Sequence, residues 1–299
     1  MLVLIGITSA VIFGAADFFG GLAATKLDAL KVTAIGAVTG LICLIIGSTV
    51  VAGHWSWESA ALGGLSGVAG AIAITLLYAC LAIGPMSILA PIMALVSAVV
   101  PIGVGFARGE RLSTIGYLGL IVGLVSIVLI CFVPDARAAR PSGRGILMAV
   151  GAGLAVGLYL IFIDLSPADS GLSPLIATFA VAGLATGGIL LARTTVAAMA
   201  GQRIPRGTLR PAGTRQSTGP LWHGPVGLSI YSGLTDATAC ILFLVALRIG
   251  DLSVVSVLNA LSPAGTILLA AVVLRERIAV VQWIGLAVAL AAAAMLALA

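Results

Sequence analysis

Apolar residues fill long stretches of the chain, and polar residues fall mainly in the short joins between them. A helix needs about 20 mostly apolar residues to cross a bilayer. Ten stretches meet this requirement: 2–24, 30–52, 59–83, 86–107, 114–133, 145–164, 172–192, 224–247, 252–274 and 279–298. The pattern therefore predicts an all-α integral membrane protein with about ten transmembrane helices.

The joins between these stretches differ in length. Only 84–85 and 248–251 separate the third stretch from the fourth and the eighth from the ninth, so these neighbours are expected to run antiparallel. Two longer joins, 134–144 and 193–223, are predicted to be loops. The second is basic and rich in Gly, Pro, Ser and Thr, which is typical of a flexible hydrophilic loop on the cytoplasmic side.

Composition agrees with a membrane protein, because 61% of the residues are hydrophobic and only 8% are charged. A soluble domain carries about 25% charged residues. The net charge of +5 is therefore interpreted as loop charge that sets orientation, and no nucleic-acid partner is expected. The four cysteines form no CxxC motif, so neither disulfides nor a metal site is predicted, and no cofactor is expected.

The chain also resembles itself. Residues 71–124 align without a gap to 237–290 at a shift of 166 positions, and sixteen of the fifty-four pairs are identical. The identical pairs include Gly84 with Gly250, Ser87 with Ser253, Leu95 with Leu261, Gly119 with Gly285, and Glu110-Arg111 with Glu276-Arg277. Chance explains these Gly, Ser and Glu-Arg matches poorly, so an internal duplication is predicted.

The duplication divides the chain into two repeats of five helices, 1–133 and 145–299, joined by 134–144 and with the basic loop 193–223 inside the second. An odd number of spans forces the second repeat to insert upside down relative to the first. Inverted repeats of this kind occur in many secondary transporters, with the substrate site near the midplane between the halves.

Particular motifs carry a family resemblance. GPMSILAPIMAL followed by GERLS, and GDLSVVSVLNALSPAGTILLA followed by RERIAVVQWIGL, resemble the EamA repeat of the drug/metabolite transporter superfamily, and FGAADFFGG is similar to its first-span pattern W/F-G-x-x-x-F. The resemblance covers nearly the whole chain. It implies a ten-helix transporter, commonly an exporter of small metabolites or drugs, without naming a substrate. We expect it in the bacterial cytoplasmic (inner) membrane, and interpret both Glu-Arg pairs as helix-end signals.

Orientation is ambiguous from the sequence. With ten spans, twelve of the fifteen Lys and Arg residues lie on one side of the membrane and three on the side that holds both termini. The positive-inside rule then places the termini outside. Members of the EamA family, which this chain resembles, usually have both termini inside. The charge count and the family resemblance therefore favour opposite orientations.

Two carboxylates interrupt apolar stretches. Asp17 lies roughly 22 Å along its helix from Leu2 at 1.5 Å per residue, and Asp236 lies near the middle of the eighth stretch. A charge near the bilayer centre costs at least ~2.5–3.5 kcal/mol on insertion scales, so it usually faces a cavity or a partner. Both are predicted to line a central substrate or proton cavity, Asp236 more deeply. The alternative is that each only joins helices through Ser and Thr.

Other polar residues are predicted to line the same cavity. Around Asp236, Ser232 and Thr235 lie on nearly the same helical face, while Ser256 and Asn259 share one in the ninth stretch. Tyr78, Tyr159 and Tyr231 are added as candidates, with Tyr231 favoured because it lies one turn before Thr235. The prolines predicted to break helices beside the cavity are Pro91, Pro101 and Pro263. The alternative for Ser, Thr and Asn is hydrogen bonding between helices.

These observations predict a secondary transporter that moves a small organic solute by alternating access, and proton-coupled export is the expected mode. The expected partners are a small-molecule substrate, protons and the lipid bilayer, and the protein is expected to be a monomer or a homodimer. The alternative is a non-transporting sensor or assembly subunit. A membrane enzyme is the least favoured class, because the sequence has no HExxH, no GxSxG and no mid-span His.

Overall fold

The computed structural model describes residues 1–51, 53–83, 86–131, 142–199 and 224–298, and these are helical apart from short joins. Ten helical segments in them are long and apolar enough to cross a membrane, which confirms the predicted all-α fold. The helices are α1 (Leu2–Ala24), α2 (Ala29–Ser48), α3 (Trp57–Ile83), α4 (Met86–Ala107), α5 (Thr114–Cys131), α6 (Gly143–Asp164), α7 (Ser173–Met199), α8 (Pro225–Ile249), α9 (Leu252–Ala260), α10 (Ser262–Val273) and α11 (Val280–Ala297), with a 3-10 turn, η1 (Ala168–Ser170).

Both predicted loops need adjustment. α7 continues to Met199, so 193–199 are helical and the prediction of a loop from 193 is wrong there; apolar and helix-forming residues extend the span by two turns. Residues 200–223 lie outside the described part of the chain, as do 134–141. At the end of the first loop, Ser142 caps α6, since its hydroxyl accepts a hydrogen bond from Gly145 N–H at 3.1 Å.

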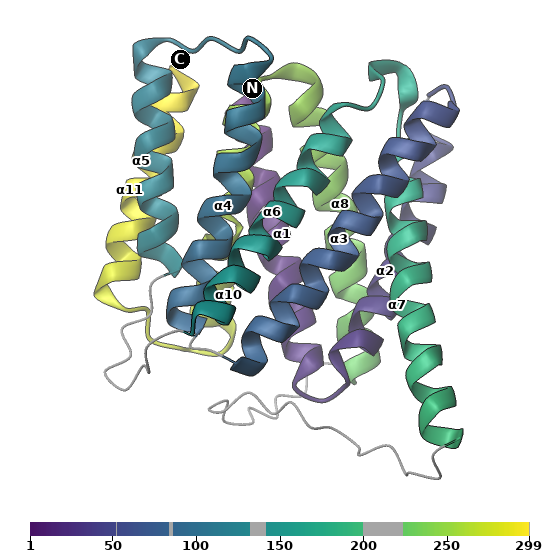
Figure 1. Ribbon diagram of the computed structural model, residues 1–299. Helices are drawn as coiled ribbons and strands as arrows, with labels where there is room; N and C mark the ends of the chain where they lie inside the picture. Colours follow the sequence, from purple (N-terminus) through teal and green to yellow (C-terminus); the bar gives the residue numbers. More distant parts are fainter. Residues whose placement is uncertain (52, 84–85, 132–141, 200–223, 299) are drawn as a thin grey trace.

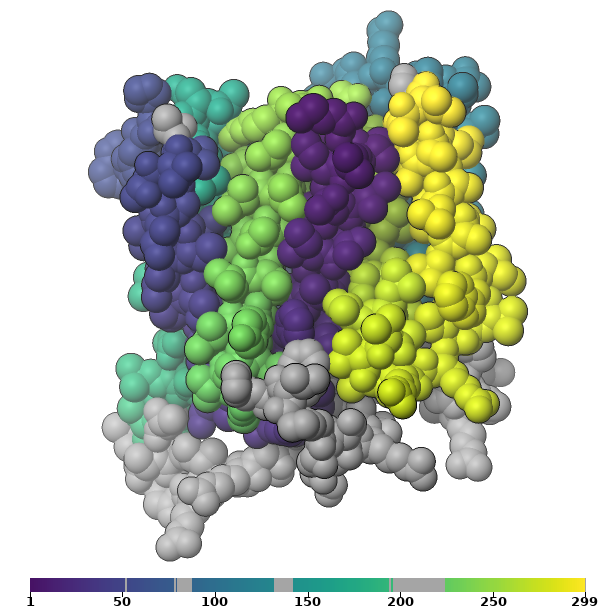
Figure 2. Space-filling view, turned by 180° about the vertical axis from the view of Figure 1, so that it is seen from behind, coloured from purple at the N-terminus to yellow at the C-terminus, as the bar shows by residue number. Residues whose placement is uncertain are grey.

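The helices form one bundle, and both termini lie at the same end of it (Figure 1). We call this end the terminal face; it also carries the joins α2–α3, α4–α5, α6–α7 and α8–α9. The opposite end, the loop face, carries the joins α1–α2 and α10–α11. In the view from behind, α1 lies at the surface between α8 and α11 (Figure 2).

Helices from the two halves of the chain pack against each other. α1 packs along α8, α4 packs on α6 and α9, and α5 packs on α11. Small residues allow the closest approaches: a Cβ added to Gly14 would lie 2.5 Å from the Ser262 carbonyl oxygen and 2.6 Å from Thr266 N. The first and second halves therefore share one interior instead of forming separate units.

The ninth span is divided, as Pro263 predicts, because α9 ends at Ala260 and α10 begins at Ser262 with Pro263 in its first turn. The same prediction is wrong for Pro91 and Pro101, which lie inside a continuous α4. A proline removes one backbone N–H from a helix, and packed membrane helices tolerate that loss when neighbouring groups satisfy the freed carbonyl. Pro263 differs because the chain turns at Leu261, where ψ is 0°.

The largest apolar cluster is concentrated toward the terminal face. It combines the later residues of α2, α6 and α8 with the first residues of α7 and α9, including Leu44, Ile163, Leu175, Phe243 and Leu252, all buried. Toward the loop face, the clusters around Ala23 and around Leu89 have only two or three buried members each among the described residues. A second cluster, which includes Val254 and Leu258 of α9, reaches Ile127 and Ile130 near the loop-face end of α5. The interior formed by α2, α6 and α8 is therefore packed most extensively nearer the terminal face.

Candidate functional site

Asp17 lies on the side of α1 that faces into the bundle. The lipid-facing side is marked by Leu4 and Val11, which are 71% and 46% exposed. Thirteen residues separate Leu4 from Asp17, a rotation of about 220° at 3.6 residues per turn. Asp17 is nevertheless exposed, and nothing lies within 4 Å of a Cβ added one turn on at Gly21. The inward side of α1 is therefore accessible near its loop-face end.

Asp236 also lies on the inward side of its helix, α8. Leu234 and Val245 mark the outward side of this helix, at 43% and 40% exposed. Asp236 is two residues from Leu234, a rotation of about 200°, so it also points into the bundle and is half-buried. The two carboxylates lie within electrostatic range of each other. The structure thus brings together the two charges that the sequence placed 219 positions apart (236 minus 17).

Two hydrogen bonds near these carboxylates fix α1 against α8. The Ser232 hydroxyl donates to the Ala16 carbonyl at 2.9 Å, and the Ser9 hydroxyl donates to the Ala239 carbonyl at 2.9 Å. Ser232 therefore joins helices, which was the alternative interpretation of this residue. Its role is to hold the backbone beside Asp17 in register with α8, so that both carboxylates face the same interior.

A tyrosine and a cysteine continue the polar groups beyond Asp236. The Tyr159 hydroxyl on α6 lies 3.4 Å from Cys240 Sγ, and both groups lie within electrostatic range of Asp236. Tyr159 was a sequence candidate, whereas Cys240 was not. The available signal was spacing, since Cys240 follows Asp236 by four residues and so shares its helical face.

Ser256 and Asn259 lie on the central helix α9. Ser256 is 0% exposed and Asn259 is half-buried. Within the described residues, the Ser256 Oγ and Asn259 Oδ1 atoms are buried and have no hydrogen-bond partner. The predicted polar face of this helix thus exists, and two of its atoms are unsatisfied.

The other candidates lie apart from the carboxylates. Tyr231 is 49% exposed on the outward side of α8, where its ring lies 6.2 Å from that of Phe19 on α1. Thr235 donates to carbonyls of its own helix, Tyr231 O at 2.7 Å and Ser232 O at 3.0 Å. The side chain of Tyr78 lies outside what the structure describes. The direction of each side chain depends on the helix rotation at its position, and this rotation places Tyr231 on the lipid-facing side of α8.

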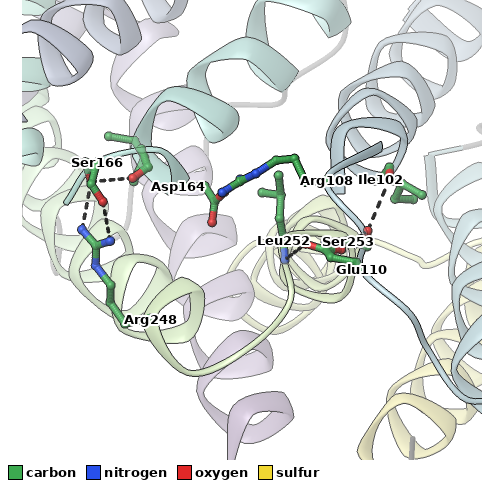
Figure 3. Close-up of polar contacts among 9 residues, drawn as sticks. Ile102, Arg108, Glu110, Asp164, Ser166, Arg248, Leu252 and Ser253 are labelled. Carbon is green, nitrogen blue, oxygen red and sulfur yellow. Dashed lines mark hydrogen bonds and ion pairs between the residues drawn. The ribbon is translucent and has the colours of Figure 1, made fainter. Parts of the chain in front are cut away.

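A carboxylate from the first half closes the terminal face by capping a helix of the second half. Glu110, in the α4–α5 join, accepts hydrogen bonds from Leu252 N–H at 2.8 Å and Ser253 N–H at 3.1 Å, and the Ser253 hydroxyl donates to it as well (Figure 3). These N–H groups belong to the first turn of α9, which has no partner for them within its own helix. We call this contact the terminal cap.

Two arginines add further contacts at the terminal face. Arg108, at the end of α4, forms an ion pair with Asp164 at the end of α6. Arg248, at the end of α8, donates to the Ser166 carbonyl at 2.6 Å and the Pro167 carbonyl at 2.8 Å in the α6–α7 join (Figure 3). The sequence indicated helix-end roles for the Glu-Arg pairs, but neither these partners nor Arg248 was foreseen.

Ten membrane-crossing segments around an interior that holds two carboxylates define a multi-pass α-helical membrane protein with a polar centre. The EamA-like transporter family matches residues 143–298, more than half of the chain, and the protein belongs to that family. Members of this family are membrane transporters of the drug/metabolite superfamily and are not enzymes. The described residues include no group of three or more His, Cys, Asp or Glu that could hold a metal ion.

Two further comparisons concern individual proteins. A solved structure titled "Crystal structure of protein" matches with a TM-score of 0.70 over 99% of this chain and 96% of that chain, at 17% sequence identity. This likeness shows that the fold is shared over the full length. No curated protein matches the chain.

Proposed function

We propose that the protein is a secondary transporter that moves a small organic solute by alternating access, coupled to protons, with Asp17 and Asp236 as the solute- and proton-binding groups. The observation that carries this proposal is the inward position of both carboxylates, one from each half. Carboxylates inside a membrane are costly and usually mark a substrate or ion pathway.

The arrangement of closed and accessible regions supports alternating access. The terminal cap and the apolar cluster of Phe243 and Leu252 close the terminal face, while Asp17 is accessible nearer the loop face. A solute would therefore enter or leave from the loop face in this state. In the proposed inverted repeat, the opposite state would close the loop face and open the terminal face.

The division between α9 and α10 supports a binding site at the same depth. Discontinuous helices near the midplane commonly form the sites of secondary transporters. The Thr266 hydroxyl on α10 donates to the Gly14 carbonyl at 3.0 Å, one turn from Asp17. The break therefore lies beside the first carboxylate.

Coupling follows from the proximity of the two carboxylates. Two like charges repel more strongly in a medium of low dielectric constant than in water. A proton or a positively charged group that neutralises one carboxylate relieves this repulsion, so that a proton and a solute compete for the pair. Such competition is what exchange of protons for a solute requires.

Transport into proteoliposomes under an imposed pH gradient tests the proposal. Asp236→Asn and Asp17→Asn are expected to abolish flux driven by the gradient, whereas Glu58→Gln, an exposed carboxylate at the start of α3, serves as the matched control. Unchanged flux and pH dependence in Asp236→Asn would contradict the site. Failure of a broad solute panel to be transported would favour a sensor or assembly subunit.

A further inference from the structure

α9 is the most enclosed helix of the bundle, and it carries two polar atoms that lack partners. Every residue from Leu252 to Leu258 is buried. Ser256 Oγ and Asn259 Oδ1 have no hydrogen-bond partner among the described residues. An unsatisfied buried polar group costs about 1–3 kcal/mol, and native proteins leave few of them. Something other than the described side chains is therefore expected to satisfy these atoms.

The positions of Asn259 and Asp236 are related through the apolar cluster at the terminal face. Val255 of α9 and Cys240 of α8 both belong to that cluster. Asn259 lies one turn from Val255 toward the loop face, and Asp236 lies one turn from Cys240 in the same direction. Asn259 and Asp236 thus both adjoin this apolar cluster on its loop-face side, on antiparallel helices.

The height of Asn259 in the bundle agrees with this placement. A Cβ on Gly6 of α1 would meet the Leu258 side chain, and the Ser9 hydroxyl three residues further on bonds the Ala239 carbonyl. Since α1 and α9 run in the same direction, Asn259 lies within about 5 Å in height of Cys240, the neighbour of Ala239, and about one turn above Asp236. A solute held at Asp236 would have to extend about one helical turn toward the terminal face to reach the height of Asn259.

The groups that face this space accept hydrogen bonds. Asp17 and Asp236 accept when ionised, the free amide oxygen of Asn259 accepts only, and the Ser256 hydroxyl can accept. Among α1, α8, α9 and α10, the described basic side chain is Arg248, and it is bonded to the α6–α7 join at the terminal face. An anion would find no cationic partner on these helices.

We propose that Ser256 and Asn259 form the closed end of the solute site and that the solute is an organic cation carrying N–H donors, such as a primary ammonium or a guanidinium. This inference rests on the proposed transport function. The cationic group is neutralised by Asp236 and Asp17, and its N–H donors reach Asn259 Oδ1 and Ser256 Oγ. A quaternary ammonium carries the positive charge that Asp236 and Asp17 neutralise, but it has no N–H donor for Ser256 Oγ or Asn259 Oδ1.

Two probes that differ only in donors test the inference. Benzylammonium and benzyltrimethylammonium share a ring and a charge, but only the first has N–H groups. In the purified full chain, benzylammonium is expected to raise the melting temperature and to bind about tenfold more tightly than its quaternary analogue, the value of one hydrogen bond of about 1.4 kcal/mol. Asn259→Leu and, independently, Ser256→Ala are expected to remove this preference.

The control is Thr238→Val on the outward side of α8, whose hydroxyl bonds only its own helix at Leu234 O and whose replacement should preserve the preference. Ser256→Ala is the smaller change and serves if Asn259→Leu fails to fold. Equal binding of the two probes, or a preference that survives both variants, overturns the inference, because the α9 atoms then hold only water. So does the absence of stabilisation by any ammonium, guanidinium or amidinium compound in a panel.

The outcomes also separate this inference from the proposed function. Transport of an anionic or neutral solute that still depends on Asp236 would overturn the cationic substrate class and leave the transport function intact. Loss of transport for every solute would overturn the proposed function itself.

Discussion

The two ends of the bundle carry the same Glu-Arg pair, yet they use it differently. At the terminal face, Glu110 is half-buried and caps α9 of the other half. At the loop face, Glu276, which aligns with Glu110 at the shift of 166, is exposed. Ser253, which bonds Glu110, aligns with an identical residue, Ser87. The same local sequence thus accompanies a closed end and an accessible end.

The difference shows that the Glu-Arg motif does not by itself determine which face is capped. Nothing in the Glu-Arg pair itself distinguishes the two ends. The distinction comes from packing, since the large apolar cluster lies beside the terminal cap. Variants that disturb one end and leave the other intact will show how far the two ends are independent.

The largest effect is expected from Glu110→Ala. The change removes a carboxylate that accepts hydrogen bonds from Leu252 N–H and Ser253 N–H, so roughly 2–3 kcal/mol of stabilisation of this state is lost. The melting temperature in detergent should fall, and hydrogen exchange at the start of α9 should accelerate. The control Glu276→Ala should change both by much less. Equal effects of the two variants would contradict the difference between the ends.

A smaller effect is expected from Arg248→Ala. The guanidinium bonds the Ser166 and Pro167 carbonyls, and its removal leaves these acceptors of the α6–α7 join unpaired, at a cost of about 1–2 kcal/mol. Limited proteolysis should cleave the α6–α7 join faster than in the wild type. Arg193→Ala, on the exposed part of α7, provides the comparison. A cleavage rate equal to that of the wild type would count against this role.

Removal of a helix cap at the loop face should have little effect on the contact between Glu110 and α9 at the terminal face. Asp28 accepts a hydrogen bond from Leu30 N–H at 3.0 Å and so caps its own helix, α2. Asp28→Ala should lower stability by roughly 1 kcal/mol without changing hydrogen exchange at the start of α9. If exchange at α9 rises as it does in Glu110→Ala, the two ends are coupled and the separation proposed above fails.

The smallest effect concerns Asp251, in the join before α9. Burial, and secondarily the Glu110 charge, raises the pKa of Asp251. A raised pKa means that the folded state prefers the protonated form, so stability is fully present at acidic pH and is lost as the pH rises through that pKa. Asp251→Asn should therefore raise the melting temperature slightly at pH 8 and not at pH 4. A gain that is independent of pH would exclude the charge as its cause.

Hydropathy predicted the number of spans because contact with lipid requires apolar side chains whatever their tertiary partners. It also indicated Asp17 and Asp236 as site candidates, since a charged side chain inside a membrane span is costly and usually faces a cavity or a partner. Pro263 predicted the division of the ninth span, whereas Pro91 and Pro101 left α4 continuous because packed helices tolerate a missing N–H. A single residue type was therefore an incomplete guide to a helix break.

The remaining features depend on contacts between distant segments. Glu110 bonds residues 142 and 143 positions away. Tyr159 meets Cys240 across helices 81 positions apart. Neither contact leaves a local pattern. Tyr231 shows the complementary difficulty, because it lies five residues from Asp236, a rotation of about 140°, and its ring is on the outward side.

The terminal cap also has an evolutionary consequence. The part that matches the family, residues 143–298, includes α9 but excludes Glu110. A protein made of that part alone would begin α9 with N–H groups that its own chain leaves to water or lipid headgroups. Under the proposed inverted repeat, an ancestor of single-repeat length would have needed a second copy of itself, inserted the other way up, to supply the carboxylate. The proposed duplication and fusion would then have made permanent a contact that two separate chains first had to form by association.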